Sequence, residues 1–266
     1  MELPIFVVDA FADRAFEGNP AAVCPLAEWL PVEWMQAIAA EMNLSETAFI
    51  VPAESAAGTA DYDIRWFTPT REVELIGHAT LAAGFVVLDL LGSGRNCVGF
   101  TSGPHRLTVT RLGTGLALEM PALRPRRLEA CPPALAEGLG RRPAAVLAAK
   151  HYLCVFDTAA EVASLAPDMG RLAGLDLPAV IVTAPATPPF DFVSRFFAPA
   201  NGVPEDPVSG VAHLCLAPYW ADRLGRTGLT GRQLSRRGGT VVCDDLGERV
   251  RLSGGARLFL EGRLRL

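Results

Sequence analysis

Lysine is almost missing from this chain, since Lys150 is its only example among 266 residues. An enzyme that forms a Schiff base, such as a pyridoxal phosphate enzyme, would have to use Lys150, and no site motif surrounds it. An excess of positive charge is also missing, because 24 Lys and Arg stand against 29 Asp and Glu for a formal net charge of −5. This balance argues against nucleic acid as a partner.

Membrane-length apolar runs and paired cysteines are missing too. The nearest candidate for a span, residues 79–91, covers 13 residues and contains Asp89, so a buried helix is expected there. No two of the six cysteines are close enough for a CxxC pair or a zinc ribbon, and the N-terminus has no signal-peptide pattern. We therefore expect free thiols in a cytoplasmic protein that holds no metal and does not enter a membrane.

Glycine-rich phosphate loops are the last notable absence. Neither GxGxxG nor GxxxxGK[ST] occurs, so the common nucleotide-binding loops are excluded. Half of the residues are hydrophobic and 20% are charged, which is ordinary for a globular protein and wrong for a disordered one. The length leaves room for one large or two small domains.

Hydrophobic periodicity indicates the main regular elements. An amphipathic helix is expected over residues 31–42, which Asn43 ends. Alternation of polar and apolar residues predicts a strand over residues 62–67. Residues 79–88 carry no charge on any face, so the helix expected over residues 77–91 must be surrounded by protein.

The second half of the chain repeats a pattern of the first. Arg65-Trp66-Phe67-Thr68-Pro69 matches Arg195-Phe196-Phe197-Ala198-Pro199 as an Arg-aromatic-Phe-x-Pro strand signature. A short polar loop follows each signature and leads to a glycine, Gly77 or Gly210, that opens an apolar helix. The spacing from arginine to glycine is 12 residues in one half and 15 in the other. Duplication is the stronger explanation of this match.

Duplication predicts an α/β (α+β) fold of two pseudo-symmetric domains, each a sheet wrapped around one apolar helix. The segment 121–132 carries prolines and arginines and is interpreted as the domain linker. The expected domains are therefore residues 1–122 and 123–266, with the last strand left free to cross back to the first domain.

The two apolar helices suggest where ligands bind. Their N-termini, at Gly77 and Gly210, carry unpaired N–H groups and about half a positive charge each. If the two domains face each other, both N-termini can converge on one cleft, and such a cleft favours a carboxylate.

The loops that lead into these helices hold candidate acid/base groups. The candidates are Glu72, Glu74, His78, Glu205 and Asp206, with Glu46 after the first amphipathic helix. A carboxylate in a water-poor cleft can have its pKa raised toward neutrality, which suits proton transfer. On the residues alone, Glu46 is most simply an exposed carboxylate and Asp206 a turn residue before Pro207. Glu72 and Glu74 are interpreted as a solvated strand face.

Several motifs together resemble the PhzF family of phenazine-biosynthesis-like isomerases, which are relatives of diaminopimelate epimerase. The motifs stand in family order over most of the chain and are specific as a set. They are Val8-Asp9-Ala10-Phe11, Gly18-Asn19-Pro20-Ala21-Ala22-Val23, Asn43-Leu44-Ser45-Glu46-Thr47-Ala48-Phe49, Trp66-Phe67-Thr68-Pro69, Gly77-His78-Ala79-Thr80, Glu205-Asp206-Pro207-Val208-Ser209-Gly210, Ala212-His213 and Ala217-Pro218-Tyr219-Trp220.

The resemblance implies a diaminopimelate epimerase-like fold, in which each domain is a curled, mostly antiparallel sheet and the active site lies in the cleft between the halves. It implies cofactor-free proton transfer on a small carboxylic acid. In the phenazine enzyme a glutamate moves a proton between ring carbons of a dihydro-hydroxyanthranilate, and Glu46 matches that glutamate. His78 and Asp206 match its assistants in substrate binding and proton relay. The residues implied to bind the substrate are Asn19, Ser45, Gly77, Ser209, Gly210 and Val211. A homodimer and a role in biosynthesis are implied by the same analogy.

Two positions depart from the family pattern. Ile76 stands where many members, and the epimerases, have the first of two catalytic cysteines, so a carboxylate-based isomerase is favoured over two-thiol racemisation. Val211 stands where a small polar residue is expected, which leaves the identity of the substrate open. Two other functions stay open: an amino-acid epimerase, and a non-catalytic carboxylate-binding member of the fold.

Overall fold

The chain folds into two compact units. The structure, a computed structural model, describes residues 1–53, 60–92 and 94–266. One unit comprises Met1–Met120 together with Ser253–Leu266, and the other comprises Pro121–Leu252. The last strand thus belongs with the N-terminal residues. No helix in the described part of the chain is long and apolar enough to cross a membrane.

The first unit is built on one mixed sheet. Its strands are β1 (Glu2–Ala10), β2 (Asn19–Pro25), β3 (Glu46–Pro52), β4 (Tyr62–Phe67), β5 (Glu72–Val73), β6 (Cys97–Ser102), β7 (His105–Leu112), β8 (Gly115–Pro121) and β17 (Ala256–Arg265). Neighbours pair in the order β17–β1–β2–β3–β4–β6–β7–β8, and β5 pairs with β4. The pairs β2–β3 and β4–β6 are parallel, and the others are antiparallel.

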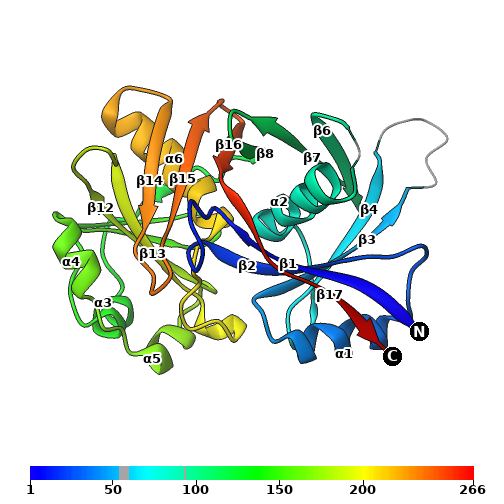
Figure 1. Ribbon diagram of the computed structural model, residues 1–266. Helices are drawn as coiled ribbons and strands as arrows, with labels where there is room; N and C mark the ends of the chain where they lie inside the picture. Colours follow the sequence, from blue (N-terminus) through cyan, green and yellow to red (C-terminus); the bar gives the residue numbers. More distant parts are fainter. Residues whose placement is uncertain (54–59, 93) are drawn as a thin grey trace. The chain divides into compact units, whose positions relative to one another are not determined.

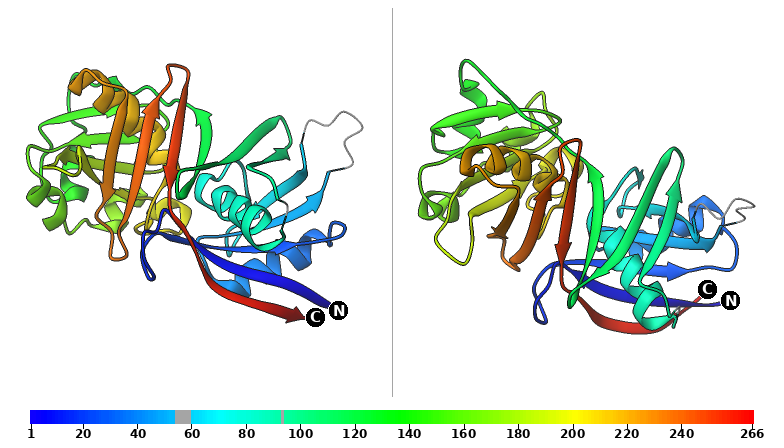
Figure 2. Two further views of the ribbon diagram at one scale, coloured as in Figure 1. Left: turned by 45° about the horizontal axis from the view of Figure 1, so that its top comes forward. Right: turned by 90° about the horizontal axis from the view of Figure 1, so that it is seen from above.

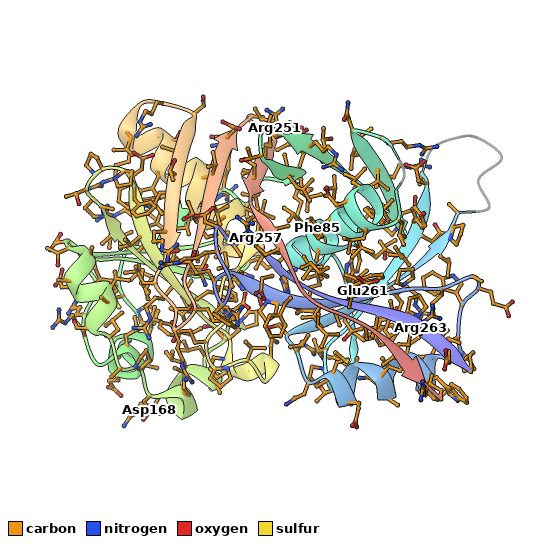
Figure 3. The ribbon with its side chains drawn as sticks, viewed as in Figure 1. Phe85, Asp168, Arg251, Arg257, Glu261 and Arg263 are labelled. Carbon is orange, nitrogen blue, oxygen red and sulfur yellow. The ribbon has the colours of Figure 1, made fainter. Side chains whose placement is uncertain are left out.

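The antiparallel pair β1–β17 brings the two ends of the chain side by side (Figure 1). Most residues of β17 are exposed, including Arg257, Glu261 and Arg263, which are labelled along it in Figure 3. Charged side chains on an outer strand oppose unwanted pairing with other chains.

Helix α2 (Gly77–Phe85) lies inside the curve of this sheet (Figure 2). It contacts β1, β2 and β3, and also β7 and β17, which lie toward opposite ends of the pairing order. A sheet that touches one helix with both of its ends must curl around that helix. Residues 77–84 are all buried, as the uncharged sequence predicted. The helix ends in a π-helical segment, η1 (Val86–Leu90).

The second unit repeats this plan. Its strands are β9 (Arg126–Arg127), β10 (Ala145–Ala148), β11 (Tyr152–Val155), β12 (Val180–Pro185), β13 (Phe192–Phe197), β14 (Gly228–Gln233), β15 (Gly239–Asp245) and β16 (Arg249–Gly254). Its helices are α3 (Pro133–Leu139), α4 (Ala159–Ser164), α5 (Met169–Ala173), the short 3-10 helix η2 (Pro199–Asn201) and α6 (Gly210–Leu224). Strands β9 to β15 pair in chain order.

The pairing pattern confirms the predicted fold class. Pairs along β1, β2, β3, β4, β6 and β7 are antiparallel, parallel, antiparallel, parallel and antiparallel. Pairs along β10 to β15 follow the same series. In each unit the second parallel pair is bridged by the apolar helix, α2 or α6. The match of sequence signatures therefore corresponds to a repeated topology.

Helix α1 (Val32–Met42) forms where the periodicity predicted a helix, and Asn43 ends it in a left-handed conformation. Its buried residues are Met35, Ile38 and Ala39, whereas Trp34 is 47% exposed. Trp34, Ile38 and Met42 repeat at helical spacing, but only Ile38 and Met42 pack against the core, where they join Met35 and Ala39.

The segment interpreted as a domain linker is part of the second unit's structure. Arg126 and Arg127 form β9 and pair with β10. Leu123 also donates its N–H to the carbonyl of Leu214 in α6, at 3.0 Å. The prolines of this segment lie outside β9, so they do not interrupt its pairing with β10.

The repeated arginine signature has a structural reason in both units. Arg65 on β4 donates two hydrogen bonds to the Glu72 carboxylate, at 2.6 and 2.7 Å, and lies 5.4 Å from the centre of the Phe67 ring. Arg195 on β13 donates to the Glu205 carboxylate at 2.7 and 3.0 Å and lies 4.8 Å from the centre of the Phe197 ring. Each signature thus builds a two-pronged ion pair beside an aromatic ring.

The two arginines differ in burial, and we expect them to differ in their contribution to stability. The side chain of Arg195 is only 12% exposed and also donates to the carbonyls of Val162 and Leu165. Arg195→Met leaves Glu205 without its partner and should cost about 3 kcal/mol of unfolding free energy. Arg65→Met breaks a more exposed pair and should cost about 1 kcal/mol or less. Urea unfolding of both variants measures the difference, and equal losses would contradict the prediction.

Candidate active site

Glu46 and His78 meet within the first unit although 32 residues separate them in the sequence. Glu46 Oε2 lies 3.1 Å from His78 Nε2, and the two side chains are 12% and 5% exposed. The contact is at ion-pair distance but does not have the geometry of a straight hydrogen bond. Catalytic pairs are often imperfectly aligned before substrate binds, so the arrangement can still exchange a proton.

The parallel pairing of β2 and β3 positions the polar residues around Glu46. Glu46 opens β3, where it is the register partner of Ala21 on β2. Asn19 opens β2 and is fully buried, and Ser45 Oγ donates to Asn19 Oδ1 at 3.3 Å. Parallel strands begin at the same edge of a sheet, so Asn19, Ser45 and Glu46 lie together at that edge.

A strained turn brings His78 to this edge. Leu75 has φ = 55°, a left-handed conformation that costs a non-glycine residue about 1–3 kcal/mol. Ile76 then returns to extended backbone and precedes Gly77, the first residue of α2. The Thr80 hydroxyl donates back to the Ile76 carbonyl and fixes this turn. His78 therefore enters the first turn of α2, which packs on β2 and β3.

The second unit holds the matching loop, which leads from β13 to α6. Asp206 is 9% exposed, and its N–H donates to the Phe196 carbonyl at 3.0 Å. Ser209 is buried and precedes α6, and its hydroxyl accepts a hydrogen bond from the N–H of Ala212 at 3.4 Å. The helix begins at Gly210, and Val211 is partly buried in its first turn. The Ser209 hydroxyl thus serves as a helix cap.

The structure therefore gathers the residues expected from sequence into two groups, one within each unit. Asn19, Ser45, Glu46, Gly77 and His78 form the group in the first unit. The group in the second unit is Asp206, Ser209, Gly210 and Val211. Of the other acidic candidates, Glu72 and Glu205 pair with the signature arginines, and Glu74 is exposed.

One residue that sequence reasoning missed contacts the second group. Gln233, the last residue of β14, is fully buried and hydrogen-bonds both Asp206 and Ser209 through its side chain. No local pattern marks this glutamine, because its partners lie 24 and 27 residues earlier in the chain.

His213 has a structural place in α6. Its side chain is fully buried, and its Nδ1 lies 2.8 Å from the Ser209 carbonyl, one helical turn earlier. Burial lowers the pKa of His213 to about 4, against 6.5 for a free imidazole. The ring is therefore neutral near pH 7, with Nδ1–H as the donor to Ser209.

The buried neutral imidazole predicts a loss of stability in acid. The pKa of His213 is lower in the folded protein, about 4, than the 6.5 of an unperturbed ring. Its contribution is therefore complete above pH 6.5 and is lost as the pH falls toward 4. At pH 4.5 we expect this residue to cost about 2–3 kcal/mol of unfolding free energy. The His213→Gln variant lacks the titrating group, so its urea midpoint should fall less than that of the wild type between pH 7.5 and 4.5. An equal fall of the urea midpoint in the two proteins would contradict this assignment.

Two of the buried cysteines, Cys24 and Cys215, are poorly suited to acid/base chemistry. All six are free thiols, as the sequence predicted. Burial raises the pKa of Cys24 to about 12 and that of Cys215 to about 12. Thiols that stay protonated at these values are poor proton acceptors near pH 7. Cys24 donates to the Pro4 carbonyl at 3.2 Å. Cys24 and Cys215 are both buried in the hydrophobic core.

Comparison with solved structures defines the class of fold. A PhzF-family phenazine biosynthesis protein from Enterococcus faecalis superposes with a TM-score of 0.94 at 42% identity, and each chain is covered completely. A predicted epimerase from Pseudomonas aeruginosa, at 23% identity, superposes with a TM-score of 0.71 over 98% of this chain and 99% of its own. This chain therefore shares its fold of duplicated sheet-and-helix units with the PhzF-family protein and with the predicted epimerase.

The sequence comparison then identifies the family. The model of the phenazine biosynthesis-like protein family, PhzC-PhzF, matches residues 8–262, and the chain belongs to this family. A Pseudomonas aeruginosa relative, named an uncharacterized isomerase, is 51% identical over 266 residues and covers all of both chains. The expected family membership is therefore confirmed.

Proposed function

We propose that this protein is a cofactor-independent isomerase that moves a proton between two carbons of a small carboxylic acid. The buried contact between Glu46 and His78, at 3.1 Å, is the observation that carries the proposal. Family membership supports it, since several relatives are named isomerases.

In the proposed reaction Glu46 acts first as a base and then as an acid. Its carboxylate takes a proton from one carbon of the substrate, and the resulting carboxylic acid returns a proton to another carbon while the double bond shifts. His78 Nε2 contacts Glu46 Oε2. An imidazole nitrogen either donates or accepts a proton, so His78 can stabilise Glu46 both as a carboxylate and as a carboxylic acid. The overall step needs no oxidant and releases nothing.

The remaining site residues are proposed to bind the substrate. Asn19 and Ser45 offer polar side chains at the edge that Glu46 occupies. The N–H groups at the starts of α2 and α6, near Gly77 and Gly210, favour a carboxylate. Asp206 is proposed to assist in substrate binding and proton relay. The Ser209 hydroxyl already accepts a hydrogen bond from the N–H of Ala212, so a substrate would have to compete with this helix cap for it.

Solvent isotope exchange tests the proposal. The protein is incubated in D₂O with a panel of small unsaturated and amino carboxylic acids that includes a dihydro-hydroxyanthranilate. Mass spectrometry then follows deuterium at carbon, and chiral chromatography follows configuration. Exchange that accompanies migration of a double bond supports the isomerase. Inversion at an α-carbon supports an epimerase instead, and binding without exchange across the panel supports a non-catalytic member.

A further inference from the structure

A buried glutamine holds both ends of the loop that precedes α6. Gln233 Oε1 accepts a hydrogen bond from the N–H of Ser209 at 3.0 Å, and Gln233 Nε2 donates to the carbonyl of Asp206 at 2.7 Å. The side chain is fully buried. The oxygen and the nitrogen of this one side-chain amide therefore both bond to backbone groups of the four-residue loop 206–209.

Neighbouring contacts fix the same loop from the same side. Ser235 Oγ donates to the Pro207 carbonyl at 2.7 Å and accepts from the N–H of Gly238 at 2.9 Å. The N–H of Leu234 donates to the Ser194 carbonyl on β13 at 2.7 Å, which ties this end of β14 to the strand before the loop. The segment 233–235 is thus anchored, and it transmits that anchoring to residues 206–209.

We propose that Gln233 is a positioning residue, which sets the directions of the Asp206 side chain and of the first N–H groups of α6 before any substrate binds. Its consequence for catalysis rests on the proposed function, whereas the clamp itself is a property of the second unit. A loop held in this way pays little ordering entropy when a ligand arrives.

The clamp requires one donor and one acceptor side by side, and this requirement makes it testable by pH. Methionine offers neither group at a similar size. An ionised glutamate offers acceptors only and would face the Asp206 carbonyl with a lone pair. A protonated glutamate again has one donor and one acceptor, so Gln233→Glu should restore the clamp at low pH and lose it as the pH rises. Burial extends the protonated range, because it disfavours the charged form.

Hydrogen exchange read by mass spectrometry measures the clamp directly. In Gln233→Met we expect exchange in the peptide that covers residues 205–211 to be at least tenfold faster than in the wild type. Gln233→Glu should match the wild type at pH 5 and Gln233→Met at pH 8, each compared at equal pH. Gln36→Met is the matched control, since Gln36 Nε2 donates to the Thr68 carbonyl at 2.9 Å in the other unit. This control should leave the 205–211 peptide unchanged. Equal protection of that peptide in all variants would overturn the clamp.

Kinetics separate a positioning role from a merely structural one. With any acid that the wild type isomerises, Gln233→Met should raise KM about tenfold with a smaller change in kcat, and Gln233→Glu should recover KM at low pH. A loosened loop with unchanged KM would overturn the role in positioning. If the wild type exchanges no acid, the proposed function fails, and the hydrogen-exchange result still decides the clamp.

Discussion

Glu46→Gln is expected to lower the rate of deuterium incorporation at the substrate's carbon by about 10³-fold or more. The amide keeps the size and hydrogen-bonding capacity of the side chain but neither takes nor returns a proton near pH 7. KM should change little, because the space around His78 and Asn19 is preserved. In the wild type the Glu46 carboxylate lies 3.1 Å from His78 Nε2. Glu46→Asp keeps the carboxylate but shortens the side chain by one methylene, so its exchange rate should lie between those of the wild type and Glu46→Gln.

Glu72→Gln is the matched control for this experiment. Glu72 belongs to the same unit and is exposed, and its carboxylate accepts from Arg65 rather than facing His78. Its exchange rate should stay within about twofold of the wild type, as expected for a surface ion pair. Glu46→Gln protein that exchanges deuterium at the wild-type rate would remove Glu46 from the mechanism.

Gly84→Ala is expected to cost about 3 kcal/mol of unfolding free energy, because the core around position 84 has no room for an added methyl group. A Cβ at position 84 would lie 2.4 Å from Val109 Cγ1, 2.6 Å from Val109 Cβ and 2.9 Å from Val109 Cγ2. The β-branched valine offers no rotamer that clears its own Cβ, so either α2 or β7 must move. Because α2 also carries His78, the shift should lengthen the contact with Glu46 and lower activity as well.

A double variant identifies the clash as the cause. Val109→Ala removes two of the three colliding atoms, so Gly84→Ala with Val109→Ala should be at least as stable as Gly84→Ala alone, a clear departure from additivity. Gly174→Ala is the control, because its added Cβ would meet only the Arg171 carbonyl, at an ordinary 3.6 Å. Thermal unfolding is measured for these four variants and for the wild type. Additive losses at positions 84 and 109 would contradict the packing argument.

Much of the fold could be predicted from the sequence because it depends on local patterns. The strand expected over residues 62–67 is β4 without a change of bounds, and the uncharged run after Gly77 is the buried helix α2. The sequence did not predict which side chains face the core where more than one set of apolar residues has helical spacing. The apolar period of α1 is satisfied by more than one stripe, and only packing against the sheet selects Met35 over Trp34.

The candidate site, like the fold, could be predicted from the sequence only in part. Family motifs named Glu46, His78 and Asp206, but on chemistry alone Glu46 was an ordinary surface carboxylate. Its burial and its contact with His78 depend on the register of β2 with β3 and on the packing of α2. Gln233 had no signal at all, because a glutamine at the end of a strand is informative only once its two partners are known.

By itself the sequence determined the types of elements, the duplication and the absence of a nucleotide loop, since each is written in residues close together along the chain. Tertiary structure alone decided that β17 joins the first unit, that residues 126–127 complete the second sheet, and that Glu46 meets His78. These outcomes depend on hydrogen-bond register and on the filling of a core, which no short stretch of residues encodes.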